Sequence, residues 1–302
     1  MSDRSPPSAL QIGVAFGILY IVWGTTYLAI QIGVLNEGLP PLLFAGSRIG
    51  SAGIILLLFQ RIRGQSLQLR ASDLPGIAIG AGLLFVIGNG LISLALKTVA
   101  SGESAVLAAT TTLWVAVVST ILPGGDRLRP AGWLGLALGF LGVVVIKSPA
   151  LREQGFSFAS NIGPWMVLAS AAAWGVGTVL MRKTTIHLPR LSSVGWQMAL
   201  GGAVMTLLGL SLGETPPDSV SLASIGAFLY LLIFGSLTAF VAFTWLLEHV
   251  SAPKVTTYAY VNPLVAVLLG SWLHDEEMPV SLILGMLLIF AALFLVRHGT
   301  RK

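Results

Sequence analysis

Ten apolar runs constrain this chain of 302 residues more than any other feature. A transmembrane helix needs about 20 apolar residues to cross a hydrocarbon core ~30 Å thick. Runs of about that length lie at residues 11–32, 40–60, 74–96, 103–122, 131–148, 162–182, 191–212, 222–247, 253–273 and 279–297. The connections between them are short, so a separate soluble domain does not fit. The sequence therefore predicts an all-α polytopic membrane protein with ten transmembrane helices surrounded by membrane lipid.

Composition excludes several other classes of protein. Charged residues make up 10% of the chain, against ~25% in soluble domains, so the chain cannot present a water-exposed surface throughout. Cysteine is absent, which removes disulfide scaffolds, zinc ribbons and thiol catalysis. The net charge is +5, but the basic residues are spread over short connections. We therefore expect no nucleic-acid partner.

The positions of Lys and Arg predict how the helices are oriented. With the N-terminus in the cytoplasm, the inner segments hold 13 of the 17 basic residues, and the outer connections hold Lys97, Lys147 and Arg152. Basic residues favour the cytoplasmic side of a membrane. We therefore expect both termini in the cytoplasm and a bacterial inner (plasma) membrane as the location. Lys147 and Arg152, on either side of the start of the connection 149–161, run against the pattern.

The two halves of the chain resemble each other at an offset of 151 residues. Trp23–Gly24 aligns with Trp174–Gly175, and KTVASGESAV before the fourth run aligns with EHVSAPKVTT before the ninth. Each half holds five runs, and an odd number places the halves in opposite orientations. The sequence therefore predicts two inverted five-helix repeats, at 1–148 and 162–302, joined by a periplasmic connection at 149–161. Inverted repeats of this kind are a known transporter architecture, in which the substrate site lies between the halves near the membrane midplane.

Several motifs, in this order, resemble the drug/metabolite transporter superfamily in its EamA-type branch of ten helices. They are WGT at 23–25, FAGSRIGSAGIILLL in the second run, WG at 174–175, VNPLVAVLLG in the ninth run, and the starts GDRLRPAGWLGLALGFLGVVVI and DEEMPVSLILGMLLIF of the fifth and tenth runs. The resemblance covers the whole chain. It implies a transporter of small metabolites whose cavity lies between runs 1, 3, 4, 6, 8 and 9. Similarity to bacterial YddG-like amino-acid exporters implies export of amino acids.

No Asp, Glu, His or Cys lies in the middle of any run, and Arg48 is the one charged residue there. Acid–base catalysis, intramembrane proteolysis and metal chemistry need such groups at depth. We therefore predict that the chain is not an enzyme and has no catalytic residue, no metal site and no cofactor. The same absence disfavours a buried proton relay. Facilitated diffusion, or coupling through the substrate's own protonation, fits better.

Arg48 lies near the centre of the second run. A charge at that depth costs at least ~2.5–3.5 kcal/mol, so it needs partners. Two interpretations stay open: Arg48 anchors a substrate carboxylate, or it ties helix ends and carbonyls together beside Gly46 and Gly50. The lack of an acidic partner favours the structural role. Small residues spaced by four, such as Gly13 and Gly17, are interpreted as close helix packing, with a homodimer contact as the alternative.

Aromatic and polar side chains three or four residues apart share one helix face and mark candidate cavity walls. With Arg48, the candidate substrate-binding residues are Tyr20, Trp23, Tyr27, Phe85, Asn89, Thr110, Trp114, Trp174, Thr178, Phe240, Thr244, Tyr258 and Asn262. Trp23 and Trp174 lie too deep for the interfacial aromatic belt, and we expect them on opposite walls of the cavity. Pro263, in the ninth run, removes a backbone donor and frees the carbonyl of Ala259.

These observations predict an inner-membrane transporter that exports small metabolites by alternating access through a central cavity. Neutral and aromatic amino acids are the first expected substrates, because a zwitterion needs few charges from the protein and its ammonium can lie against an aromatic face. The same fold carrying drugs, nucleobases or sugars is one alternative. The other is a membrane scaffold or receptor that transports nothing, against which the repeat and the polar midplane residues stand.

Overall fold

The computed structural model describes residues 7–122, 127–154, 162–250, 255 and 258–301. Helices occupy all ten predicted runs, and several runs consist of consecutive helical segments. In chain order the segments are α1 (Ala9–Gln31), η1 (Ile32–Asn36), α2 (Pro41–Ile62), η2 (Ala71–Asp73), α3 (Leu74–Ile79), η3 (Gly80–Asn89), α4 (Gly90–Ala95), α5 (Ser101–Ala108), α6 (Thr111–Ile121), α7 (Pro130–Gln154), α8 (Gly163–Lys183), α9 (Arg190–Ser211), α10 (Leu222–Tyr230), η4 (Leu231–Thr238), α11 (Ala239–His249), α13 (Tyr258–His274) and α14 (Val280–Gly299). The strands β1 (Arg127–Leu128) and β2 (Thr300–Arg301) pair antiparallel.

Length and hydropathy agree with the predicted spans. Among the described residues, seven helical stretches are long and apolar enough to cross a membrane. The shorter apolar stretches Pro130–Ile146, Val261–His274 and Val280–Val296 supply the remaining three. The prediction of an all-α polytopic membrane fold is therefore confirmed. One boundary differs: α7 continues to Gln154, into the segment predicted as a connection, because residues 150–154 (ALREQ) are good helix formers.

Local sequence explains where several helices begin. The Oγ of Ser8 accepts the backbone N–H of Gln11, and the Gln11 side chain accepts the N–H of Ser8, which is a capping box at the start of α1. Proline occupies the first turn of α2 and of α8, where its missing N–H costs nothing. The start of α2 is also capped from the other repeat, because the Glu214 carboxylate accepts the N–H groups of Leu42 and Leu43.

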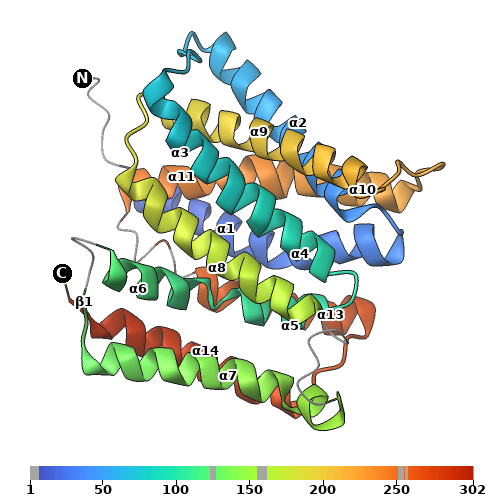
Figure 1. Ribbon diagram of the computed structural model, residues 1–302, viewed down its shortest axis with the longest axis vertical. Coiled ribbons are helices and arrows are strands. Elements are labelled where there is room, and N and C mark those ends of the chain that lie inside the picture. Colours follow the sequence, from blue (N-terminus) through green and yellow to red (C-terminus); the bar gives the residue numbers. More distant parts are fainter. Residues whose placement is uncertain (1–6, 123–126, 155–161, 251–254, 256–257, 302) are drawn as a thin grey trace.

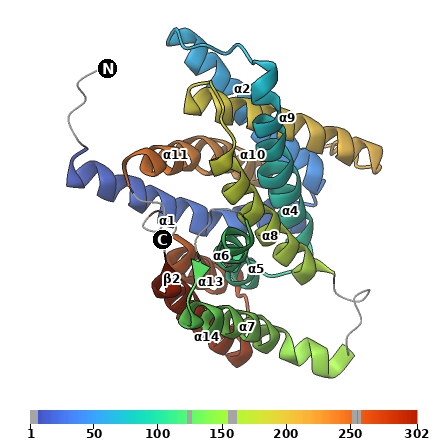
Figure 2. The same ribbon diagram turned by 60° about the vertical axis from the view of Figure 1, so that its left-hand side comes forward.

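The helices form a bundle with one tightly packed pair at each end of its long axis. In Figures 1 and 2, α7 lies along α14 at one end and α2 lies along α9 at the other, with α1, α8 and α13 between them. Each end pair joins the equivalent helices of the two halves. The largest apolar core includes buried Leu107 and Leu113 together with Ile289 and Leu293 of α14. The beginning of α1 and strand β2 lie on the same side of the bundle, as an even number of spans requires.

Contacts at the repeat offset reveal the symmetry of the two halves. A Cβ placed on Gly24 would lie 2.6 Å from the Val265 Cβ and 3.3 Å from the Asn262 carbonyl oxygen. A Cβ on Gly175 would lie 2.8 Å from the Trp114 Cβ and 3.0 Å from the Thr111 carbonyl oxygen. All three pairs of positions are 151 residues apart. The close approach of α1 to α13 is therefore repeated by α8 and α6, as expected for an inverted repeat.

The third and eighth spans share an unusual backbone at equivalent positions. Each contains a π-helical segment, η3 starting at Gly80 and η4 starting at Leu231, again 151 residues apart. A side chain bonds the carbonyl five residues earlier near the end of each segment: Asn89 Nδ2 donates to Leu84 (3.1 Å) and Thr238 Oγ1 donates to Ile233 (2.7 Å). These bonds occupy carbonyls in turns that lack regular α-helical pairing. Such segments are frequent at functional sites.

Polar contacts join the connections on both faces of the bundle. On the face that holds the chain ends, the buried Asp73 carboxylate accepts the backbone N–H of His187 at 2.9 Å, and the His187 Nδ1 lies 2.9 Å from the same oxygen. On the opposite face, the Glu37 carboxylate accepts the hydroxyls of Ser221 and Ser224. Position 224 is the repeat equivalent of 73. The starts of the third and eighth spans are therefore both held by a carboxylate contact to a connection of the other repeat. At the third span the acid is on the span itself (Asp73), whereas at the eighth span the acid is on the connection (Glu37).

A candidate substrate site between the repeats

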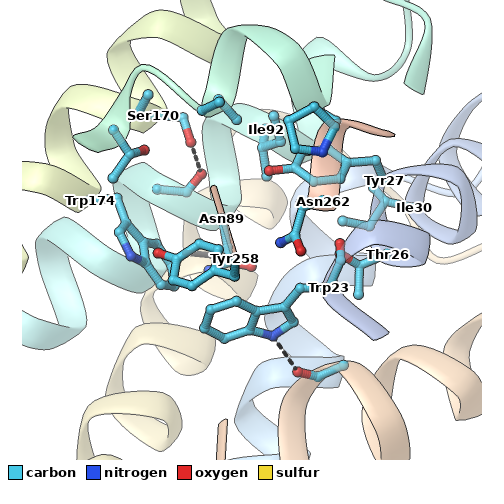
Figure 3. A pocket seen from close by; sticks show the side chains of 18 of the residues that line it. Trp23, Thr26, Tyr27, Ile30, Asn89, Ile92, Ser170, Trp174, Tyr258 and Asn262 are labelled. Carbon is cyan, nitrogen blue, oxygen red and sulfur yellow. Dashed lines mark hydrogen bonds between the residues drawn. The ribbon is translucent and has the colours of Figure 1, made fainter. Parts of the chain in front are cut away.

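A cavity of about 130 Å³ lies between the two halves of the chain. One water molecule needs ~10–15 Å³ of such space, so the cavity can hold several non-hydrogen atoms of a small ligand. Its walls come from α1, α2, η3, α4, α5, α6, α8, η4, α11 and α13, and Figure 3 shows ten of the lining residues with labels. Eight of the fourteen candidate residues line it: Trp23, Tyr27, Arg48, Asn89, Trp174, Phe240, Tyr258 and Asn262.

Trp23 is the centre of an aromatic cluster at one boundary of the cavity. Its ring lies edge-on to Trp174, with centroids 6.2 Å apart, and edge-on to Tyr258, with centroids 5.1 Å apart. The Phe240 ring is 5.4 Å away. The Trp23 Nε1–H points to the carbonyl of Gly235 at 3.4 Å (Figure 3). Trp23 and Trp174 therefore contact each other, rather than facing each other from opposite walls as the sequence suggested.

The reason for this contact lies in the glycines that follow the two tryptophans. Gly24 and Gly175 let α1 and α8 pack closely on α13 and α6. That packing places α1 and α8 at equal depth on either side of the pseudo-two-fold axis, so that Trp23 and Trp174 meet there. The two tryptophans present aromatic faces and edges to one common space, and cations favour the faces of such rings.

Arg48 is the one charged side chain among the described residues that line the cavity. It is 4% exposed, and its Nη1–H donates to the Ser236 hydroxyl at 2.9 Å. Its Nη2 lies 3.5 Å from the Asn89 Oδ1, at the limit of hydrogen-bond distance. Its Nε is buried, and none of the residues that the structure describes accepts a hydrogen bond from it. Among the described residues, no carboxylate forms an ion pair with this guanidinium.

The other polar groups of the cavity mainly hold backbone carbonyls. The Ser170 hydroxyl donates to the Gly88 carbonyl at 2.6 Å. The Asn262 amide, oriented so that its nitrogen meets acceptors, donates to the carbonyls of Tyr20 (3.1 Å) and Tyr258 (3.2 Å). This directs the Asn262 amide oxygen away from those carbonyls. Figure 3 shows the Asn262 side chain among Trp23, Tyr27 and Tyr258. Next to it, Pro263 belongs to the cavity wall within the continuous helix α13.

Six candidate residues do not line the cavity. Thr178 and Thr244 donate their hydroxyls to carbonyls of their own helices, those of Trp174 and Phe240. Phe85 is buried behind Phe240, with ring centroids 5.4 Å apart. The others are Tyr20, Thr110 and Trp114.

A helix break determines which face of the fourth span lines the cavity. The helix is interrupted between α5 and α6, where the Thr110 hydroxyl bonds the Leu107 carbonyl. The break turns Trp114 toward Phe140 of α7, with ring centroids 5.6 Å apart. Thr111 lines the cavity on this span, where the spacing of Thr110 and Trp114 predicted those two residues. On the first span, the Tyr20 ring packs on the Phe16 ring, with centroids 5.6 Å apart. The backbone carbonyl of Tyr20 accepts a hydrogen bond from the Asn262 amide.

Small and apolar residues make up most of the lining that sequence reasoning missed. These residues are Thr26, Ile30, Gly88, Ile92, Ala105, Ala108, Ala109, Thr111, Ser170, Ala171 and Gly235. Alanine, glycine and isoleucine also dominate lipid-facing and packed surfaces, so their identity carries no signal of a cavity. The spacing of Tyr27 and Ile30, which lie three residues apart on one helix face, could have found Ile30. Among the described residues, no cluster of His, Asp or Glu side chains is arranged to hold a metal ion.

Comparison with known proteins identifies the family. Residues 11–148 and 161–297 match the EamA-like transporter family. The chain is 35% identical over 285 residues to "Uncharacterized inner membrane transporter YedA" of Escherichia coli (strain K12), covering 93% of this chain and 89% of YedA. It is 25% identical to "Uncharacterized transporter YoaV" of Bacillus subtilis (strain 168), covering 94% and 96%, and 30% identical to "Protein PecM" of Dickeya dadantii (strain 3937), covering 91% and 89%.

One solved crystal structure shares the fold, with a TM-score of 0.68 at 22% identity over 96% of this chain and 98% of that chain. Both halves of the chain match the same family, in agreement with the internal repeat. The chain therefore belongs to the EamA-like transporter family of the drug/metabolite transporter superfamily, and it is a multi-pass membrane transporter.

Proposed function

We propose that this EamA-family transporter exports small zwitterionic metabolites by alternating access through the central cavity, with neutral and aromatic amino acids as its first substrates. One observation carries the proposal: a single buried guanidinium shares a small cavity with aromatic walls. A zwitterion needs one anion partner and one cation partner, and its side chain needs an apolar surface. The described lining residues offer all three, and none of them is a carboxylate.

The aromatic groups suit the ammonium and the side chain of such a substrate. An ammonium over an aromatic face gains ~0.5–2 kcal/mol, depending on how far it is desolvated. Trp23, Trp174 and Tyr258 supply such faces, and Ile30 and Ile92 supply apolar walls. A few placed polar groups in a mainly apolar pocket are typical of small-molecule sites.

Charge disfavours two other substrate classes. A phosphorylated substrate calls for several Lys or Arg residues, whereas Arg48 is the one cation among the described lining residues. A permanently cationic drug favours a buried carboxylate, and the described lining residues include no Asp or Glu. Nucleobases and sugars form the alternative that an observation favours, because the remaining amide oxygen of Asn262 can accept a hydrogen bond from their N–H or O–H groups. A scaffold without transport leaves the cavity unexplained.

We propose an inner-membrane location with both termini in the cytoplasm. The distribution of Lys and Arg supports this orientation, and YedA is named as an inner membrane transporter. The described lining residues include no Asp, Glu or His, so the cavity offers no side chain for a carboxylate or imidazole proton relay. We therefore favour facilitated diffusion, or coupling through the substrate's own protonation, with export driven by the outward gradient of the metabolite.

Two measurements test the substrate class. Cells that overproduce the protein should resist toxic amino-acid analogues, whereas cells producing the same amount of a Trp23→Ala variant should not. In a ligand panel on the purified protein, neutral and aromatic amino acids should raise the melting temperature, because a ligand that binds the folded state stabilises it. If nucleobases, sugars or quaternary-ammonium dyes stabilise the protein and amino acids do not, the amino-acid assignment is wrong.

A further inference from the structure

We propose that Arg48, positioned by Ser236 and Asn89, is the carboxylate-binding group of the cavity, so that substrates enter with a fixed polarity. This inference rests on the proposed export of zwitterionic metabolites and adds the direction in which they bind. The substrate carboxylate meets the guanidinium between the third and eighth spans. The ammonium and the side chain then meet the aromatic cluster around Trp23.

Small residues of α2, and not Arg48, make its closest approach to the partner helix α9. Gly46 and Gly50, on either side of Arg48 in the sequence, face α9: a Cβ on Gly46 would lie 2.7 Å from the Thr206 backbone nitrogen, and one on Gly50 would lie 3.6 Å from the Gly202 Cα. Arg48 reaches the opposite way, toward η3 and η4 and into the cavity. The repeat equivalent of Arg48 is Ala199. Within this single pair of equivalent helices, α2 therefore carries an arginine where α9 carries an alanine.

The hydrogen bonds of the guanidinium leave room for an anion. A guanidinium has five N–H donors, and two bonds are found here, to the neutral oxygens of Ser236 and Asn89. Neither partner balances the charge, and no described residue accepts a hydrogen bond from Nε. A buried charge without a counter-ion is costly. A carboxylate supplies the missing charge and can accept two parallel N–H bonds from one arginine.

Ser236 and Asn89 are positioning residues, because each sits on a π-helical segment and bonds a different nitrogen of Arg48. Ser236 is 1% exposed, and its hydroxyl fixes Nη1 at 2.9 Å. Asn89 is itself held by the Leu84 carbonyl at 3.1 Å. The two segments belong to different repeats, so an anion bound at Arg48 contacts a group that joins both halves of the transporter.

The aromatic and amide groups of the cavity suit a cation. Trp174 and Tyr258 present aromatic rings there, and the Asn262 amide nitrogen is occupied by two carbonyls, which leaves the amide oxygen as an acceptor. An ammonium is favoured by both kinds of group. A carboxylate placed against these rings would meet aromatic faces and the Asn262 amide oxygen, which repel it. The reversed binding orientation is therefore disfavoured.

The test compares ligands that differ in one charged group. In proteoliposomes that carry the protein, transport of labelled phenylalanine is measured against three competitors: unlabelled phenylalanine, phenylalaninamide, which lacks the carboxylate, and 3-phenylpropanoate, which lacks the ammonium. For the wild type, we expect phenylalaninamide to compete at least about tenfold more weakly than phenylalanine, and 3-phenylpropanoate to keep measurable competition. Equal competition by phenylalanine and phenylalaninamide would overturn the proposal.

Variants then assign the preference to Arg48. Arg48→Gln should abolish the difference between phenylalanine and phenylalaninamide, and Ser236→Ala should reduce it about threefold or more. Thr238→Val is the matched control: it removes a hydroxyl from the same π-helical segment that bonds its own helix and not Arg48. Thr238→Val should keep the wild-type preference. A folded Arg48→Gln protein with unchanged preference would contradict the proposal. If Arg48→Gln does not fold, Ser236→Ala decides by the same criterion.

The failure of the substrate class can be told apart from the failure of this inference. If phenylalanine is not transported, the same three ligands are tested on the wild type and the three variants by thermal stabilisation of the purified proteins. The anion site would be supported if 3-phenylpropanoate stabilises the wild type and Thr238→Val but stabilises Ser236→Ala less. In that case only the proposed export of amino acids would be wrong. No carboxylate-dependent stabilisation in the wild type would overturn the anion site as well.

Discussion

Trp23 packs against aromatic rings from three other helices, α8, α11 and α13, at the depth where the two repeats meet. Its position follows from the Trp–Gly pair in each half. The glycine removes the side chain that would keep α1 away from α13, and the tryptophan fills the space beside it. The same pair of residues therefore serves helix packing and the cavity wall together.

We predict that Trp23→Ala and Trp174→Ala each lower transport of the substrate at least tenfold. The reason is the loss of the ring that bounds the cavity and faces the ligand. Trp23→Phe should retain more transport than Trp23→Ala, because it keeps an aromatic face. Uptake or efflux is measured well below the melting temperature of each variant, since removal of a packed tryptophan costs up to about 3–5 kcal/mol.

Trp133→Ala is the control for these variants, because Trp133 is 54% exposed on the outside of the bundle. It should transport like the wild type. Normal transport by both Trp23→Ala and Trp174→Ala would show that the cavity wall is not part of the pathway.

The sequence could locate residues whose chemistry is unusual for the inside of a membrane. Arg48, Asn89, Trp23 and Trp174 are recognisable because a charge, an amide or a mid-span tryptophan needs a reason to be there. Ala108 and Gly235 are not recognisable, since the same residue types fill ordinary packed helices. Whether two recognised residues touch, as Trp23 and Trp174 do, depends on helix crossing geometry that no single span encodes.

At the scale of the helix, hydropathy predicts where a span lies but not how its backbone is wound. The residues of η3, GAGLLFVIGN, suit a regular α-helix as well as a π-helix. The side-chain hydrogen bonds from Asn89 to the Leu84 carbonyl and from Thr238 to the Ile233 carbonyl accompany the π-helical winding, and they are visible only in the structure. The break between α5 and α6 likewise turned Trp114 away from the cavity although its spacing from Thr110 was helical. π-Helical segments and breaks of this kind offer positions at which a helix can bend.

Helix ends give a prediction about stability. The N-cap residue of α5 is Ala100, which has no side-chain acceptor. The carboxylate of Glu276 replaces it, accepting the N–H groups of Ser101 at 2.8 Å and Gly102 at 3.0 Å. Loss of a cap costs about 0.5–2 kcal/mol. Glu276→Ala should therefore lower the melting temperature of the purified protein.

Glu277→Ala is the control, because the neighbouring Glu277 is exposed and caps no helix among the described contacts. It should leave the melting temperature close to the wild-type value. Glu276→Gln should fall between the two, since it keeps an acceptor oxygen and loses the charge that favours a helix N-terminus. Equal melting temperatures for Glu276→Ala and Glu277→Ala would contradict a capping role.

For the whole molecule, the prediction of two inverted repeats came from two sequence features. These are the odd number of spans in each half and the offset of 151 residues between the halves. These two features predicted that the halves are structurally equivalent. The structure confirms this, because Gly24 and Gly175 make equivalent contacts and η3 and η4 start at equivalent positions. The two sequence features could not give the crossing of the helices or the size of the cavity, because both depend on how small residues such as Gly46 and Gly202 let pairs of helices approach.

The orientation in the membrane is tested by cysteine labelling, which is direct because the natural chain has no cysteine. Asn36→Cys and Pro216→Cys, both at exposed positions, should react with an impermeant reagent from the periplasm. Gln65→Cys and His187→Cys, also exposed, should react only after the membrane is permeabilised. Reversed labelling would invert the orientation, and labelling of positions 36 and 65 from one side would contradict the number of spans.

Flux through the purified protein tests the proposed function most directly. Proteoliposomes loaded with labelled phenylalanine, methionine or threonine should release the amino acid faster than protein-free liposomes, and Trp23→Ala proteoliposomes should release it at least tenfold more slowly than the wild type. Release should be saturable, as expected for binding in a cavity that is exposed to each side in turn. Release at the protein-free rate for all three amino acids, from protein shown to be folded and inserted, would contradict amino-acid export through this cavity.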